Sequence, residues 1–115
     1  MEQLTGLKLI EITKQINQST LIFEGKNEKK FVLTFEGTVF ETINSSLGKK
    51  VQYSNITNTI GIKGIYYLGK ANKSWGEYQQ LFLEMEGSND ENKTELICII
   101  KNCKFEKLWV LHNGV

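Results

Sequence analysis

One stretch of the chain decides the fold: Thr94-Glu95-Leu96-Ile97-Cys98-Ile99-Ile100-Lys101. Successive side chains of a strand point to opposite faces of a sheet, and every residue from Leu96 to Ile100 is apolar. A strand with one face in water would alternate more cleanly between apolar and polar residues. The pattern therefore predicts a central strand with both faces at least partly covered, by a sandwich, a rolled barrel or a helix packed across the sheet.

Further strand candidates lie on the N-terminal side of this stretch. Glu77–Glu86 predicts a hairpin with it, joined by the polar loop of residues 87–93. Phe31–Glu36 is the clearest of the others, because its aromatic and aliphatic side chains alternate with polar ones. The chain contains no proline, so its turns must be built from glycine, asparagine, serine and lysine. The remaining candidates are Leu7–Ile12, Ser19–Glu24, Val51–Ser54 and Ile62–Leu68.

Two segments fit either a helix or a strand. Thr38–Leu47 has apolar residues at helical spacing, but its β-branched and aromatic residues favour a strand that continues past a bulge at Gly37. Phe105–His112 also has apolar residues at helical spacing, and its alternate residues would equally share one face of a strand. We leave both readings open for this last segment.

These patterns together predict an all-β, antiparallel single domain that spans residues 1–115. The turn spacing indicates about seven strands in a sandwich or rolled barrel, with room for one short helix. A chain of 115 residues is long enough to bury its own core without metals or crosslinks. We find no repeat, linker or shift in composition that would divide it.

Charge and composition argue against several classes of partner. The net charge is only +1, and all 14 basic residues are lysines, so the arginine fork that reads phosphate and guanine is missing. We therefore expect no nucleic-acid partner. The longest purely apolar run, Leu96–Ile100, is far too short to span a membrane, and no segment resembles a signal peptide. We expect a cytoplasmic protein without a membrane partner, and the sequence leaves its oligomeric state open.

Groups suited to catalysis or metal binding are scarce. His112 is the only histidine and Asp90 the only aspartate, and Asp90 falls in a polar turn that is poorly suited to hold a catalytic carboxylate. Glu84 and Glu86 share one face of a predicted strand, as glutamates on a solvated face commonly do. We expect no catalytic residue, no metal site and no cofactor. Cys98 and Cys103 match no zinc or redox motif, and we expect two reduced, at least partly buried thiols.

An aromatic cluster around the polar loop of residues 69–76 is the strongest binding candidate. It comprises Tyr66, Tyr67, Trp75 and Tyr78, with lysine and asparagine nearby. Aromatic rings in such a setting stack on ligands or anchor a protein partner. Trp75 has a second interpretation, in which its ring folds back over the end of the core as a lid.

The stretch from Leu21-Ile22-Phe23-Glu24 through Phe31-Val32-Leu33-Thr34-Phe35-Glu36-Gly37-Thr38-Val39 resembles small bacterial β proteins, some of which are similar to immunity proteins that neutralise toxins. The resemblance covers less than a fifth of the chain and implies a regulatory or immunity-like role. We therefore expect a non-enzymatic bacterial protein that binds another protein. The alternatives are a rolled sheet that encloses a small ligand and an enzyme that uses glutamates and lysine.

Overall fold

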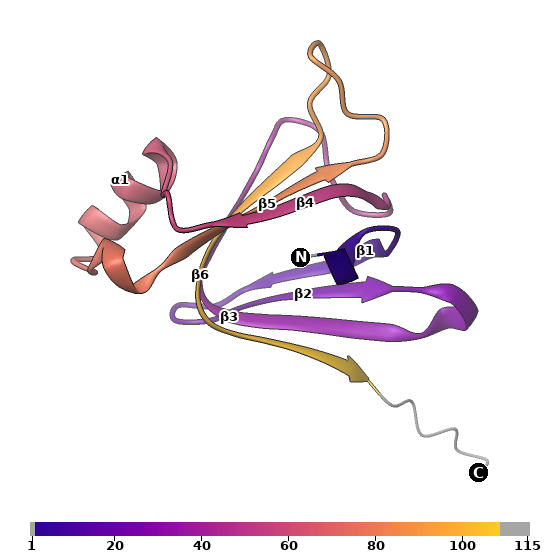
Figure 1. The fold of residues 1–115 in the computed structure, drawn as a ribbon, viewed down its shortest axis with the longest axis horizontal. Coiled ribbons are helices and arrows are strands. Elements are labelled where there is room, and N and C mark those ends of the chain that lie inside the picture. Colours follow the sequence, from indigo (N-terminus) through magenta and orange to yellow (C-terminus); the bar gives the residue numbers. More distant parts are fainter. Residues whose placement is uncertain (1, 109–115) are drawn as a thin grey trace.

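The computed structural model describes residues 2–108 and contains one antiparallel sheet and one helix (Figure 1). The sheet has six strands in the order β1-β2-β3-β6-β5-β4, so the expected all-β antiparallel fold is confirmed with six strands rather than about seven. The strands are β1 (Lys8–Lys14), β2 (Ser19–Glu24), β3 (Lys30–Glu41), β4 (Val51–Thr57), β5 (Gln79–Met85) and β6 (Glu95–Leu108). The helix is α1 (Ile62–Lys70), and three short 3₁₀ turns are η1 (Glu2–Leu4), η2 (Lys26–Glu28) and η3 (Trp75–Glu77).

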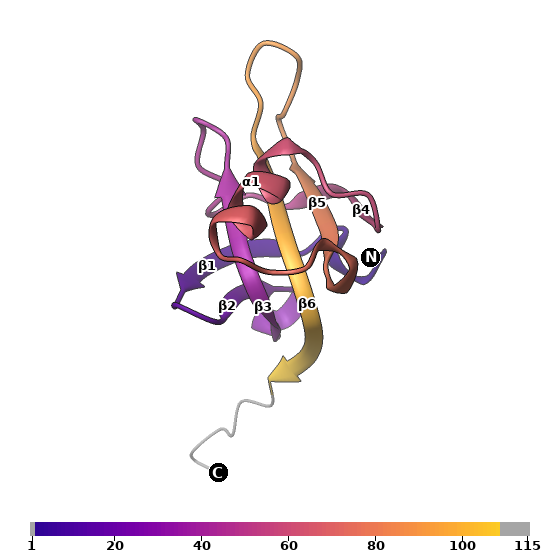
Figure 2. The same ribbon diagram turned by 90° about the vertical axis from the view of Figure 1, so that its left-hand side faces the viewer.

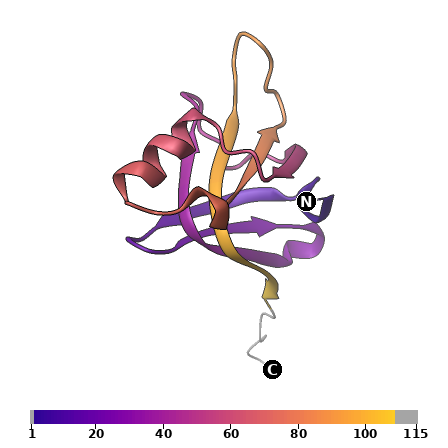
Figure 3. The same ribbon diagram turned by 60° about the vertical axis from the view of Figure 1, so that its left-hand side comes forward.

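The two longest strands, β3 and β6, pair with each other and join two parts of the sheet. β1 and β2 extend from the first half of β3, whereas β5 and β4 extend from the first half of β6 (Figure 1). A bulge interrupts the β3–β6 ladder, because Asn102 and Cys103 together face Phe35. Asn102 has a positive φ of 52°, and a bulged strand bends at such a point. Figure 3 shows the bend near the C-terminal end of β6.

The edge strands β1 and β4 meet at one place. Lys8 and Lys50 form an isolated antiparallel bridge, flanked by hydrogen bonds from Val51 N to Leu7 O and from Leu9 N to Lys49 O, each 2.9 Å long. Gly6 N also donates to Val51 O, and Gly48 N to Leu9 O. Beyond this contact the two edges are not paired in the described residues, so the sheet folds over on itself without closing.

The main core fills the space inside the folded sheet. Leu33, Phe35 and Val39 of β3 are buried against Leu96, Cys98 and Ile100 of β6, and both other pairs of strands add side chains to the same cluster. The burial alternates along β3 and β5, as expected for strands that present one face to this core. The other members are Leu4, Leu9, Leu21, Phe23, Val51, Leu81, Leu83 and Met85.

Helix α1 covers the opposite face of β3 and β6 (Figure 2). Leu68 packs with Ile99 and Tyr78 in a second buried cluster, which Ile97 also contacts. The prediction that residues 96–100 form a central strand covered on both faces is therefore confirmed, with the folded sheet on one face and the helix on the other. Gly64 permits the close approach, because a Cβ there would lie 2.5 Å from Cδ1 of Ile99.

The predicted strand over Ile62–Leu68 is wrong, because these residues form α1. The helix ends in a Schellman motif: Lys73 N donates to Leu68 O at 2.9 Å, and Asn72 N donates to Gly69 O at 3.2 Å. Asn72 occupies the left-handed position of this motif, with φ of 57°. Packing of one helix face on the sheet outweighs the low helix propensity of the glycines and β-branched residues in this segment.

The two ambiguous segments both begin in strand conformation. The preferred strand reading of Thr38–Leu47 holds through Glu41, where β3 ends, and residues 42–50 are a loop. Gly37 lies inside β3 with φ of 139°, and the bulge is in the partner strand β6. Residues 105–108 belong to β6, whereas the rest of the Phe105–His112 segment, His112 included, lies outside the described residues.

Candidate functional site

The structure divides the four predicted aromatic residues into two pairs. Tyr66 and Trp75 are exposed, with 66% and 53% of their surface accessible, whereas Tyr78 is buried and Tyr67 is half-buried. α1 and the turn that contains Trp75 lie on the same side of the molecule, at the left of Figure 1. The exposed pair is therefore accessible to a partner, whereas Tyr67 and Tyr78 pack in the buried cluster between α1 and the sheet.

The supporting pair is anchored in the second buried cluster. Tyr67 packs edge-on against Phe40 of β3, with ring centroids 6.3 Å apart. Tyr78 packs with Leu68 and Ile99, and the Nζ of Lys101 lies 5.7 Å from the centroid of its ring. Burial raises the pKa of the Tyr78 phenol above its ordinary value, and the positive charge of Lys101 opposes that rise. These contacts fix the position of α1 on the sheet.

The outward face of α1 presents apolar and basic side chains together. Ile62, Tyr66 and Lys70 are spaced four residues apart, so they lie along one side of the helix. The Nζ of Lys70 lies 5.2 Å from the centroid of the Tyr66 ring, a cation–π contact. We call Ile62, Tyr66, Lys70, Lys73 and Trp75 the α1 surface. Ile62 and the lysines were not among the residues predicted for the site.

The α1 surface belongs to a segment without acidic residues. Residues 42–76 contain five lysines and no aspartate or glutamate, although the chain as a whole is nearly neutral. The four ion pairs found within residues 2–108 all use lysines outside this segment. This uneven distribution is visible in the sequence, and it is the signal that could have found Lys70 and Lys73.

Exposed apolar side chains are concentrated in the same segment. Among the described residues, nine large apolar side chains are exposed, and seven of them lie between residues 42 and 76. Singly scattered apolar residues need no explanation, whereas a contiguous patch marks an interaction site, and three of these seven belong to the α1 surface. The seven are Ile43, Leu47, Tyr53, Ile56, Ile62, Tyr66 and Trp75.

A surface hollow of about 490 Å³ adjoins the α1 surface and shares Lys73 with it. Tyr67 and Tyr78 line it together with Lys101 and Glu36. We call it the Tyr78 hollow. Lys101 is also ion-paired with Glu77, at 3.4 Å between Nζ and Oε1. The Tyr78 hollow is thus lined by aromatic rings and by charges of both signs.

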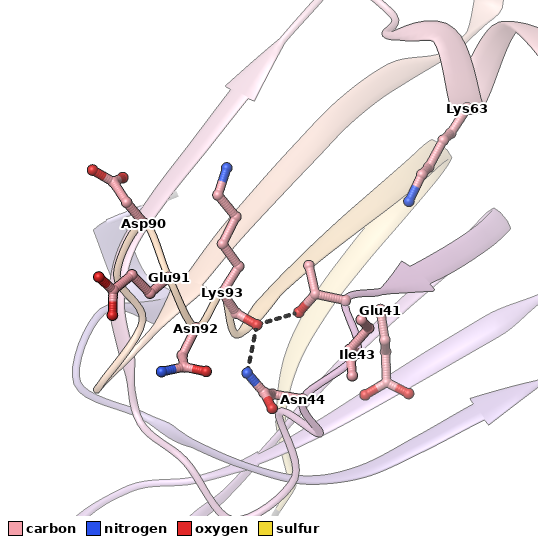
Figure 4. A pocket seen from close by; sticks show the side chains of 9 residues that line it. Glu41, Ile43, Asn44, Lys63, Asp90, Glu91, Asn92 and Lys93 are labelled. Atoms are coloured by element: carbon pink, nitrogen blue, oxygen red, sulfur yellow. Dashed lines mark hydrogen bonds between the residues drawn. The ribbon is translucent and has the colours of Figure 1, made fainter.

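A second hollow lies between the loop after β3 and the loop between β5 and β6 (Figure 4). The two loops are joined because Thr42 Oγ1 and Asn44 Nδ2 both donate to Lys93 O, at 2.9 and 3.0 Å. Lys63 reaches toward it from α1. Its charged lining, Glu41, Lys63, Asp90, Glu91 and Lys93, mixes both signs, so we exclude Lys63 from the α1 surface.

The groups considered for catalysis or metal binding do not converge. Glu84 Oε1 accepts a hydrogen bond from Gln52 Nε2 at 2.8 Å, and Glu86 lies beyond the end of β5. Within residues 2–108, no group of three or more histidine, cysteine or acidic side chains is placed to hold a metal ion. Burial raises the thiol pKa of Cys98 above its ordinary value. Cys98 is buried as expected, but the expectation of a partly buried Cys103 is wrong, because it sits exposed at the β6 bulge.

Comparison with known proteins adds no relative: no protein-family model, curated protein or solved structure matches the chain. None of the helices within residues 2–108 is long and apolar enough to cross a membrane.

Proposed function

We propose that this chain is a non-enzymatic binding protein that engages another protein through the α1 surface, in a regulatory or immunity-like role in the bacterial cytoplasm. One observation carries the proposal: Ile62 and Tyr66 are exposed on α1, whose opposite side is anchored to the sheet, and Trp75 is exposed in the turn that follows the helix. Tyrosine and tryptophan are the residues that most often dominate the free energy of protein association.

The attachment of α1 supports this role energetically. Leu68 is fully buried and the Schellman motif holds the C-terminal end of the helix, so the α1 surface is ordered before a partner arrives. Binding then loses little conformational entropy, because the apolar side chains are carried on a fixed backbone. Tyr66 already contacts Lys70, so its side chain loses still less conformational entropy on association.

The small-ligand alternative draws less support from the fold. Apolar side chains occupy the interior of the folded sheet, and Phe23, Leu33 and Leu81 there are fully buried. The Tyr78 hollow is open to solvent and lined largely by polar side chains. It suits a polar side chain of a protein partner better than the enclosed apolar ligand expected of a rolled sheet.

The test separates binding from stability. A tagged copy is used to capture partners from host cells, with Tyr66→Ser and Trp75→Ser as variants and Tyr53→Ser as the control, since Tyr53 is similarly exposed on β4. We expect one dominant partner, lost in both α1 variants and kept by the control, with little change in the free energy of unfolding. A partner that all three variants retain would contradict the proposal. A loss of several kcal/mol in Trp75→Ser would support the lid interpretation instead.

A further inference from the structure

We infer that the partner of the α1 surface presents an acidic surface, with carboxylates around an apolar patch. This inference rests on the proposed function and specifies the partner's chemistry. It starts from Lys70 and Lys73, the two lysines of the α1 surface, which accompany exposed apolar side chains and take part in no ion pair within residues 2–108. A positive patch is complemented by a negative one, which raises the rate of association and excludes like-charged partners.

The lysines of the α1 surface have no acidic partner of their own. Lys70 contacts only the ring of Tyr66 among the interactions found, and neither Lys70 nor Lys73 takes part in an ion pair within residues 2–108. Covering a lysine with an apolar partner would remove its hydration without replacement, which is costly. Carboxylates beside the partner's apolar residues would offset that cost. A partner that covers both the apolar side chains and the lysines of the α1 surface therefore needs apolar and acidic groups side by side.

Nucleic acid fits the same surface less well. The chain contains no arginine, and its basic groups near Trp75 are interrupted by negative charge: Glu77 is two residues away and Glu36 lines the adjoining Tyr78 hollow. A phosphate backbone carries closely spaced negative charges, so a strand bound along this surface would be repelled by these carboxylates. A folded acidic protein carries discrete carboxylates that can avoid them. The observations therefore favour carboxylates interspersed with apolar side chains over a phosphate backbone.

The probe for this inference is a random copolymer of glutamate and tyrosine, whose binding is followed by fluorescence anisotropy. Two double variants are compared: Lys70→Glu with Lys73→Glu on the α1 surface, and Lys26→Glu with Lys29→Glu in the distant β2–β3 turn, which changes the net charge equally. We expect roughly tenfold weaker binding for the first variant and little change for the second, because charge reversal replaces attraction by repulsion only at the contact. We also expect binding to weaken as salt rises from about 50 to about 300 mM.

The outcomes separate this inference from the proposed function. Equal weakening in both double variants, or no binding of the copolymer, would overturn the inference. Tighter binding of polyuridylate RNA or of anionic lipid vesicles than of the copolymer would also overturn it. A partner captured from cells that requires Tyr66 and Trp75 but tolerates the Lys70–Lys73 reversal would leave the proposed function standing and remove the acidic partner. Capture that does not depend on Tyr66 or Trp75 would remove the proposed function itself.

Discussion

Gly37 is the position where a single added methyl group has the clearest consequence. It lies in β3 opposite Ile100 with φ of 139°, a conformation that side chains rarely adopt. A Cβ built there would overlap the carbonyl oxygen and carbon of Ile99, which are backbone atoms of the central strand β6. Because no side-chain rotation relieves such a clash, Gly37→Ala must separate β3 from β6 or distort one of them.

The expected loss of stability combines two effects. An unfavourable φ costs about 1–3 kcal/mol, and forcing extra atoms into a packed contact costs about 1–3 kcal/mol more. We expect Gly37→Ala to lower the free energy of unfolding by about 3 kcal/mol or more, against the 5–15 kcal/mol typical of a whole domain. For a chain of this size that corresponds to a fall of roughly 10–20 °C in Tm.

Gly69→Ala is the matched control for this substitution. Gly69 lies in α1, and a Cβ there would meet nothing within 4 Å. Replacing a helical glycine by alanine should raise stability by about 0.5–1 kcal/mol. Urea unfolding followed by tryptophan fluorescence measures both variants. A loss smaller than about 1 kcal/mol in Gly37→Ala would contradict the close approach of Gly37 to the Ile99 backbone, because strain and clash together exceed that value.

Three further predictions concern the helix cap, the buried tyrosine and the thiols. Asn72→Val should lower the free energy of unfolding by about 1–2 kcal/mol in urea melts, because a β-branched residue is strained at φ of 57°, whereas Asn72→Gly should be tolerated. Burial raises the pKa of Tyr78, so the stabilising contribution of its neutral phenol is complete below about pH 10 and is lost as pH rises through the folded-state pKa. Urea denaturation measured between about pH 9 and 11 should therefore show a steeper fall in the free energy of unfolding for the native chain than for Tyr78→Phe. A thiol reagent should titrate Cys103 in the folded protein and reach Cys98 only after unfolding, and a Cys103→Ser variant that still reacts when folded would contradict the burial of Cys98.

The central part of the fold could be predicted from the sequence because its signal is local. The apolar residues 96–100 indicated coverage on both faces, and the structure places the main core on one face and α1 on the other. One short helix was allowed for, but its position was missed. Its two buried residues, Gly64 and Leu68, are spaced four apart, but a glycine is not counted as an apolar position in a pattern. Only the close approach of α1 to Ile99 explains why glycine is needed there.

The sequence indicates which aromatic residues lie near one another but not which of them are exposed. Tyr66 and Trp75 are exposed as a binding role requires, but Tyr78 is buried, because sequence proximity does not tell which side of a turn a ring occupies. Lys70 was missed because its contact with Tyr66 depends on the helix. Residues four apart are neighbours on a helix, but they are far apart along a strand. The acid-free segment was available in the sequence and needed no structure to be seen.

The most direct test of the α1 surface is photo-crosslinking in living host cells. A benzoylphenylalanine is introduced in place of Tyr66, and in a separate chain in place of Tyr53, which is similarly exposed on β4. We expect one discrete crosslinked protein from position 66, with an acidic surface at the crosslinked region, and no such product from position 53. The same product from both positions, or none from position 66, would contradict the claim that the α1 surface binds a protein partner.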